Sequence, residues 1–155
     1  MKLARVDQAL EVCEQHLVRT GTLGTEIESF LTRHVLVLMC ASFEEEIEKI
    51  VLERAANAND PALESFVRSA LDVLFRSAKC GEIAGLLNRF GSNYKARFQE
   101  CVNGTLAEIA WNNIVHNRHS AAHSSGSNLT FRELVDFYEK GHSILDHFRE
   151  VLGSG

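Results

Sequence analysis

The stretch TEIESFLTRHVLVLMCASFEEEIEKIVLERAANA, residues 25–58, contains neither proline nor glycine. Thr25, with Glu28 three residues later, has the spacing of a capping box, in which each side chain satisfies a free backbone N–H at the start of a helix. Apolar residues then recur at helical spacing, at Ile27, Leu31, Val35, Leu38, Ile47 and Ile50. The stretch therefore predicts one long helix that opens at Thr25 and runs as far as Ala58. Four acidic residues are expected on its outer face: Glu44, Glu45, Glu46 and Glu48.

The same helical spacing extends over the rest of the chain, which has a single proline. Helical rather than alternating spacing, with so little proline, predicts an all-α domain. Breaks rich in glycine, asparagine or serine separate the helices at 21–24, 59–61, 91–93, 103–104 and 124–126. Further helix starts are marked by Asp60 ahead of Pro61, Thr105 with Glu108, and Thr130 with Glu133. Because short loops between amphipathic helices favour antiparallel neighbours, we expect an antiparallel helical bundle of about five to six helices.

Apolar stripes on the later helices are the expected core. In the third helix the stripe is Leu63, Phe66, Val67, Ala70, Leu71 and Leu74. In the helix after Thr105 it is Ile109, Trp111, Ile114 and Val115, and in the last helix Leu134, Phe137, Tyr138, Ile144, Leu145 and Phe148. Trp111 is expected in the core or in a dimer contact rather than as a stacking platform for bases. The cysteines are widely separated and are expected to be buried free thiols: Cys13, Cys40, Cys80 and Cys101.

Length and charge narrow the possible classes of protein. The 155 residues fit one domain, expected to span residues 1–152, with 153–155 as a flexible end. The longest apolar run, 35–41, is far shorter than the ~18 residues of a membrane span, and the first residues lack the pattern of a targeting peptide. We therefore expect a cytoplasmic protein without membrane contact. The net charge of -5 argues against tight, sequence-independent nucleic-acid binding but allows contact with RNA at a local basic patch.

The segment HNRHSAAHSSG, residues 116–126, places an arginine and three histidines near the end of a predicted helix. One interpretation is structural, because cations at a helix C-terminus offset the partial negative charge of the unpaired carbonyls by about 0.3–1 kcal/mol each. A second is a zinc site, since His116, His119 and His123 would lie within ~60° of one another on an ideal helix. Against zinc, adjacent helical turns rarely supply three convergent ligands unaided, and no acidic partner is evident.

A third interpretation joins Arg118 to His123. Arginine binds phosphate through a fixed fork of donors, and histidine moves protons near neutral pH. Phosphate binding and proton transfer are the two functions needed when the neighbouring 2′-hydroxyl of RNA cleaves a phosphodiester, and the reaction then needs no metal or other cofactor. Five steps of ~100° leave the two side chains ~140° apart on a regular helix. Either the helix loosens before His123, or a second subunit completes the site.

The sequence RHSAAH, residues 118–123, resembles the Arg-(four to six residues)-His signature of the HEPN superfamily of small helical domains. The segment MCASFEEEIEKIV, residues 39–51, resembles the second-helix segment of prokaryotic stand-alone HEPN domains, in the groups that include RiboL-PSP-HEPN. The segment AAHSSGSNLTFRELVDFY, residues 121–138, resembles the passage from that signature through a turn into a capped final helix. The resemblance covers most of the chain, from about Ile27 to Phe148.

This resemblance implies a metal-independent endoribonuclease that acts as a homodimer, in a toxin–antitoxin, phage-defence or RNA-processing system. Arg118 would bind the phosphate and His123 would be the general acid and base, in a cleft at the dimer interface. His119 fills the polar position after the arginine, where asparagine or aspartate is common. The implied partners are RNA, a second copy of the chain, and an antitoxin or regulatory protein. Other HEPN domains are non-catalytic dimerisation or binding modules, and the acidic net charge favours that alternative.

Two further sets of residues have a functional and a structural interpretation. Glu44 or Glu45 either belongs to a solvated helix face or orients Arg118 or a histidine within a small polar network. A compact basic group is a candidate RNA track or ordinary solvated charge: Arg89, Lys95 and Arg97.

Overall fold

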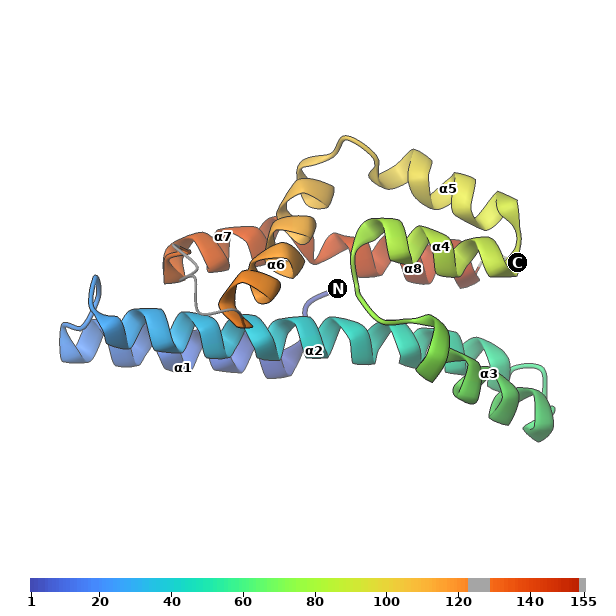
Figure 1. Ribbon diagram of the computed structural model, residues 1–155, viewed down its shortest axis with the longest axis horizontal. Coiled ribbons are helices and arrows are strands. Elements are labelled where there is room, and N and C mark those ends of the chain that lie inside the picture. The colour runs from blue at the N-terminus through green and yellow to red at the C-terminus, as the bar shows by residue number, and fades with distance from the viewer. Residues whose placement is uncertain (123–128, 154–155) are drawn as a thin grey trace.

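The computed structural model describes residues 1–122 and 129–153, and the side chains of residues 119–122 are outside that description. Within these ranges the chain is all-α, as predicted, with no strand (Figure 1). The helices are α1 (Ala4–Thr20), α2 (Glu26–Ala56), α3 (Pro61–Leu74), α4 (Cys80–Phe90), α5 (Ser92–Val102), α6 (Leu106–Ala122), α7 (Phe131–Gly141) and α8 (Ser143–Gly153).

The described residues form eight helices, more than the five to six expected. The expected last helix is divided, since α7 ends at Gly141 and α8 begins at Ser143. Gly91 and Gly104 have positive φ angles of 145° and 76°, so α4, α5 and α6 are separate helices with sharp turns between them. Gly153, expected in the flexible end, belongs to α8, while 154–155 lie outside the described residues.

The long helix α2 is the axis of the fold, as its uninterrupted sequence predicted. Figure 1 shows α1 antiparallel to α2, α6 crossing its middle, and α7 followed by α8 running in the same direction as α2. The buried face of α2 consists of Thr32, Val35, Leu36, Met39, Cys40, Ser42, Phe43, Ile47, Ile50, Val51 and Ala55. The expected stripe was partly wrong, because Ile27 is exposed and Leu38 is half-buried.

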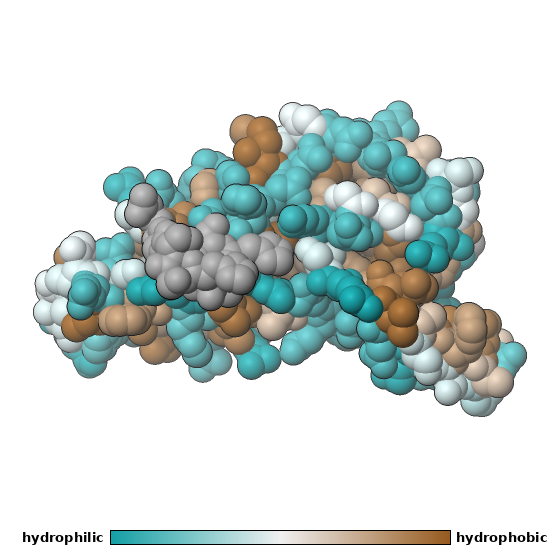
Figure 2. Space-filling model, viewed as in Figure 1, coloured by the Kyte–Doolittle hydropathy of each residue, from teal (hydrophilic) through white to brown (hydrophobic). Residues whose placement is uncertain are grey.

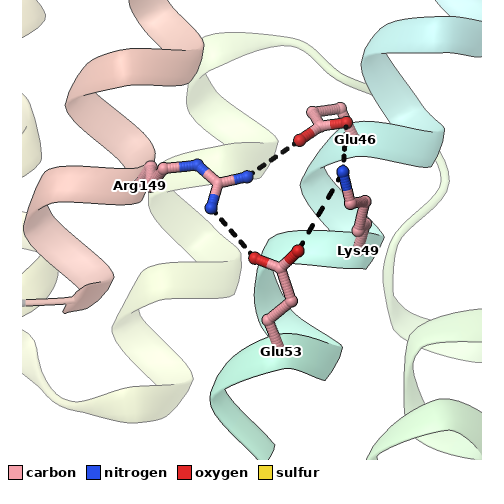
Figure 3. A network of polar contacts seen from close by, with 4 residues as sticks. All are labelled: Glu46, Lys49, Glu53 and Arg149. Carbon is pink, nitrogen blue, oxygen red and sulfur yellow. Dashed lines mark hydrogen bonds and ion pairs between the residues drawn. The ribbon is translucent and has the colours of Figure 1, made fainter.

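The placement of Glu46 on the outer face was also wrong. Its side chain is 13% exposed and pairs with Arg149 of α8, Nη2 to Oε1, at 2.9 Å. Figure 3 shows Arg149 reaching Glu53 as well, at 2.9 Å, while Lys49 lies between the two carboxylates. Ion pairs from Arg149 of α8 therefore turn this part of α2 into a contact between the two helices.

The crossing of α6 over α2 is centred on Trp111, which is fully buried as predicted. Its ring stacks on Phe43 of α2, with ring centroids 4.0 Å apart, and its indole N–H donates to the carbonyl of Ala78. On the other side, α7 approaches so closely that a Cβ at Gly141 would lie 3.1 Å from the Trp111 backbone nitrogen. The rotation of α6 is thus fixed at Trp111, whose ring packs on α2 and whose backbone packs against α7.

The expected core stripe of α3 was mostly wrong. Leu71 is the buried residue of the helix, whereas Leu63, Phe66 and Leu74 are 42%, 69% and 42% exposed. Figure 1 shows α3 extending away from the rest of the bundle, so only one side of it meets α2. Ile109 of α6 is likewise exposed, because it lies ~200° around the helix from the buried Trp111 and so faces away from the core.

The predicted capping residues begin their helices, with two adjustments. Thr130 and Glu133 form the complete capping box of α7. Glu28 accepts instead from Gly24 N at 2.6 Å and from Phe131 N at 2.9 Å, so it joins the start of α2 to the start of α7. At α6 the corresponding glutamate also bonds one residue earlier than predicted, with Glu108 accepting from Gly104 N.

The close approach at Gly141 predicts that Gly141→Ala destabilises the protein by about 1–3 kcal/mol, because backbone atoms of a packed helix cannot easily move away from the new methyl group. Gly85→Ala in α4 is the matched control. It has no heavy atom within 4 Å of the added Cβ and should stabilise by about 0.5–1 kcal/mol. Urea unfolding of the three proteins measures both changes, and equal effects would contradict the proposed constraint.

Candidate functional site

Arg118 is carried by α6 to the surface beside α2. Because it follows Trp111 and Ile114 by seven and four residues, it shares their side of the helix, which faces α2. Both of those residues are fully buried, and they fix the direction in which Arg118 extends. Its Nη1 donates to Oε1 of Glu44 at 2.7 Å, and the two side chains are 34% and 24% exposed. The structure therefore brings together two of the predicted site residues, 74 positions apart.

Cys40 lies beneath this ion pair. Its thiol donates weakly to the carbonyl of Ile114 at 3.9 Å and is close enough to Arg118 to interact with it electrostatically. Burial raises the pKa of the Cys40 thiol to about 12, and the positive charge of Arg118 only partly opposes that rise. The thiol is neutral at physiological pH, so Glu44 supplies the negative charge beside Arg118.

The surroundings of the Arg118–Glu44 pair are acidic. The pKa of Glu48 is raised, first by partial burial and then by the nearby charges of Asp72, Glu44 and Glu45. Glu45 also pairs with Arg5 of α1 at 3.7 Å, across an exposed surface. Four carboxylates thus surround two guanidinium groups, and this face of a single chain does not attract phosphate strongly.

The three histidines of the segment 116–126 are not brought to Arg118 by the described residues. His116 is exposed and lies ~200° around α6 from Arg118, so the two face opposite sides of the helix. His119 belongs to α6, but its side chain is outside the described residues, and so is the whole of His123. Because α6 is helical through Ala122, the loosening expected ahead of His123 does not occur within the described helix.

A polar hollow of about 440 Å³ opens where the start of α4 meets the outward side of α6. It is lined by Lys79, Gly81, Glu82, Asn112, Asn113 and His116. Asn112 also fixes the two helices together, because its Oδ1 accepts from Cys80 N at 3.1 Å. Sequence reasoning missed this hollow, since Lys79 lies outside any motif and is joined to His116 only by the way the helices pack.

The basic group lies elsewhere on the molecule. Arg89 and Arg97 are exposed and Lys95 is half-buried, at the end of α4 and along α5. Figure 1 places the turn between α4 and α5 near the C-terminus, away from the end of α6 that crosses α2. The structure does not bring this group to Arg118.

Over the described residues, no group of three histidine, cysteine, aspartate or glutamate side chains could hold a metal ion. The three-histidine zinc alternative depends on His119 and His123, whose side chains lie outside the described ones. None of the described helices is both long and apolar enough to cross a membrane.

The fold and the site define a small all-helical domain in which an arginine near the end of one helix is held by a glutamate of the long central helix. The chain matches the RiboL-PSP-HEPN family over residues 2–154 and belongs to that family. HEPN domains are typically ribonuclease toxins. No curated protein and no solved structure matches the chain significantly.

The cysteines differ in burial, which corrects the expectation that all four are buried: Cys101 is exposed and Cys13 is half-buried. Burial raises the pKa values of Cys40 and Cys80 to about 12. We therefore predict that Ellman's reagent at pH 8 titrates Cys101 first and Cys13 more slowly, and that it reaches Cys40 and Cys80 only after unfolding. Peptide mapping after a timed reaction identifies the modified thiols, and early modification of Cys40 would contradict the described site.

Proposed function

We propose that the protein is a metal-independent endoribonuclease that acts as a cytoplasmic homodimer, with Arg118 and His123 as its catalytic residues. The observation that carries the proposal is Arg118, which lies at the signature position of a HEPN-family chain and is held at the surface by Glu44 rather than buried in the core. A guanidinium that is one-third exposed is accessible to a phosphate group.

The proposed chemistry is an internal transfer within the RNA backbone. His123 takes the proton of the 2′-hydroxyl, whose oxygen attacks the adjacent phosphorus while the bond to the 5′-oxygen breaks. The imidazolium returns a proton to that leaving oxygen. Arg118 neutralises the charge that develops on the phosphate oxygens. One product ends in a 2′,3′-cyclic phosphate and the other begins with a 5′-hydroxyl, and no cofactor takes part.

Glu44 is proposed as a positioning residue. A carboxylate that accepts from one edge of a guanidinium limits the rotamers of the arginine side chain. The other N–H groups of the guanidinium stay available to bind phosphate. We propose that a second subunit completes the site, because α6 shows no loosening among its described residues, the last of which is Ala122. Further contacts to RNA are proposed only for His119, Lys79, Arg89, Lys95 and Arg97.

We place this activity in a toxin–antitoxin, phage-defence or RNA-processing system, with an antitoxin or regulatory protein as a further partner. A non-catalytic dimerisation or binding module is the second candidate. It is favoured by the net charge of -5 and by the carboxylates around Arg118, which oppose RNA binding to a single chain.

The test is cleavage of a mixed RNA pool in EDTA by wild type, Arg118→Ala and His123→Ala. Each substitution should reduce the rate by at least ~100-fold, since positioned proton transfer and charge stabilisation each contribute about that much. Arg19→Ala and His16→Ala remove the same residue types from α1 and should leave the rate unchanged. Products should carry 2′,3′-cyclic phosphate ends.

Circular dichroism establishes that each variant is folded. Equal cleavage by wild type and both site variants would show that the activity does not belong to this site. Absence of cleavage by wild type on structured and unstructured RNA would favour the binding module. Loss of cleavage in EDTA, with recovery on addition of zinc, would favour the metal-site alternative.

A further inference from the structure

A small hollow lies between the start of α1 and the middle of α2. It has a volume of about 270 Å³ and is lined by residues 3–5, where α1 begins, and by four residues of α2: Ser42, Glu45, Glu46 and Lys49. Figure 1 shows α1 beginning beside the middle of α2, and Figure 2 shows mainly hydrophilic side chains over that part of α2 on the face in view. The hollow is smaller than the ~300–1,000 Å³ of sites that take drug-sized molecules, so its size suits a small ion.

The first turn of α1 leaves two backbone N–H groups without an acceptor. Leu3 N donates to the hydroxyl of Tyr138 at 2.8 Å, and the N–H groups of residues 6 and 7 donate to the Leu3 carbonyl. Within the described part of the chain, Ala4 N and Arg5 N have no such acceptor, and Leu3 makes no side-chain cap. Because α1 is 17 residues long, its dipole adds to the attraction of these N–H groups for an anion.

Ser42 is an independent sign of a ligand at the same place. The residue lines the hollow and is only 6% exposed, and its Oγ has no hydrogen-bond partner among the described residues. A buried hydroxyl without a partner is costly, and such groups are uncommon in folded proteins. Rotation about the one torsion of the serine side chain directs Oγ into the hollow. An acceptor bound there would satisfy this hydroxyl together with the two N–H groups of α1.

Two cations and two carboxylates surround the hollow. Arg5 pairs with Glu45 at 3.7 Å, and their side chains are 66% and 67% exposed. Such a long, exposed ion pair is weak, so Arg5 is able to leave Glu45 for a bound anion. Glu46 is held by Arg149 at 2.9 Å, and Lys49 lies 3.5 Å from it (Figure 3). The charge of Glu46 is thus balanced, and Glu45 is the carboxylate that opposes an anion.

We propose that this hollow binds a phosphate group through the N–H groups of Ala4 and Arg5, the hydroxyl of Ser42 and the guanidinium of Arg5. The oxygens of a phosphate accept hydrogen bonds in several directions, which matches donors that come from two helices. The phosphate group is that of the inorganic ion or of a mononucleotide. This site does not include Arg118, and the inference goes beyond the proposed ribonuclease activity.

The amide resonances of the first turn test the site directly. When a ¹H–¹⁵N spectrum is recorded during titration with phosphate to ~20 mM, the Ala4 and Arg5 signals should shift, because their N–H groups gain an acceptor. Ala62 and Leu63 are the matched control, since Asp60 Oδ1 already accepts from both at the start of α3. Their signals should stay in place. Sodium chloride keeps the ionic strength constant and should move neither pair of signals.

Substitutions with opposite expected effects test the proposed contacts. Ser42→Ala should weaken phosphate binding, measured from the same shifts, by at least about tenfold, because a hydrogen bond to a charged group is lost. Arg5→Gln should weaken binding several-fold. Glu45→Gln should strengthen it several-fold, since Glu45 both repels the anion and holds Arg5. Arg19→Gln, at the other end of α1, is the matched control and should leave binding unchanged.

Urea unfolding without phosphate separates a binding role of Ser42 from a structural one. Ser42→Ala should be at least as stable as wild type, because the hydroxyl that it removes has no partner among the described residues. A destabilised Ser42→Ala variant would show that the hydroxyl serves the fold and would overturn the inference. Unchanged Ala4 and Arg5 signals, equal shifts at the start of α3, or equal affinities of wild type and Arg5→Gln would overturn it as well.

Titrations with 5′-AMP and adenosine distinguish the sources of the phosphate group. Equal affinities for phosphate and 5′-AMP would identify the ion as the ligand. A gain of about tenfold or more for 5′-AMP, lost in Ser42→Ala, would identify a mononucleotide. Adenosine lacks the phosphate, and shifts of the Ala4 and Arg5 signals on its addition would overturn the inference. No RNA is present in these titrations, so their result is independent of the proposed ribonuclease activity.

Discussion

The structure depends on the crossing of α6 over α2, where Trp111 stacks on Phe43 with ring centroids 4.0 Å apart. A buried aromatic pair of this size is a large apolar contact, and the close approach of Gly141 to the Trp111 backbone packs α7 tightly against the same turn of α6. Seven residues after Trp111, two turns of the same helix place Arg118 over the carboxylate of Glu44. The geometry of the site is therefore set by packing in the core, well below the polar residues that are proposed to act on RNA.

In a single chain, the negative charge around Arg118 opposes the binding of RNA that the proposed chemistry requires. Arg118 is paired with Glu44, and Glu45, Glu48 and Asp72 add further negative charge. That surplus hinders approach of a polyanion to a single chain, and completion of the site by a second subunit, as proposed, would change that balance of charge.

Local patterns in the sequence were enough to predict the helical class, the long α2 and the residues that begin the helices, because these depend on interactions between residues close together in the chain. The burial of Trp111 followed from its place in an apolar stripe, although its partners lie far away in the sequence. Arg118 was identified from its motif, but its actual partner could only be suggested among the glutamates of α2, since the contact joins positions 74 apart. The exposed stripe of α3 was misassigned because an amphipathic helix has the same pattern whether its apolar side meets its own core or another molecule. Glu46 was misassigned for a related reason: its partner, Arg149, lies on a helix whose placement no local pattern specifies.

The central claim is that Arg118 is held at the surface for chemistry and is not required for the fold. A double-mutant cycle of Arg118→Ala and Glu44→Gln, read out as the free energy of unfolding in urea, tests this most directly. For a pair with side chains 34% and 24% exposed, the account predicts a coupling energy below about 1 kcal/mol and a folded Arg118→Ala variant. A coupling of about 3 kcal/mol or more, with Arg118→Ala strongly destabilised, would identify the ion pair as structural and contradict the account.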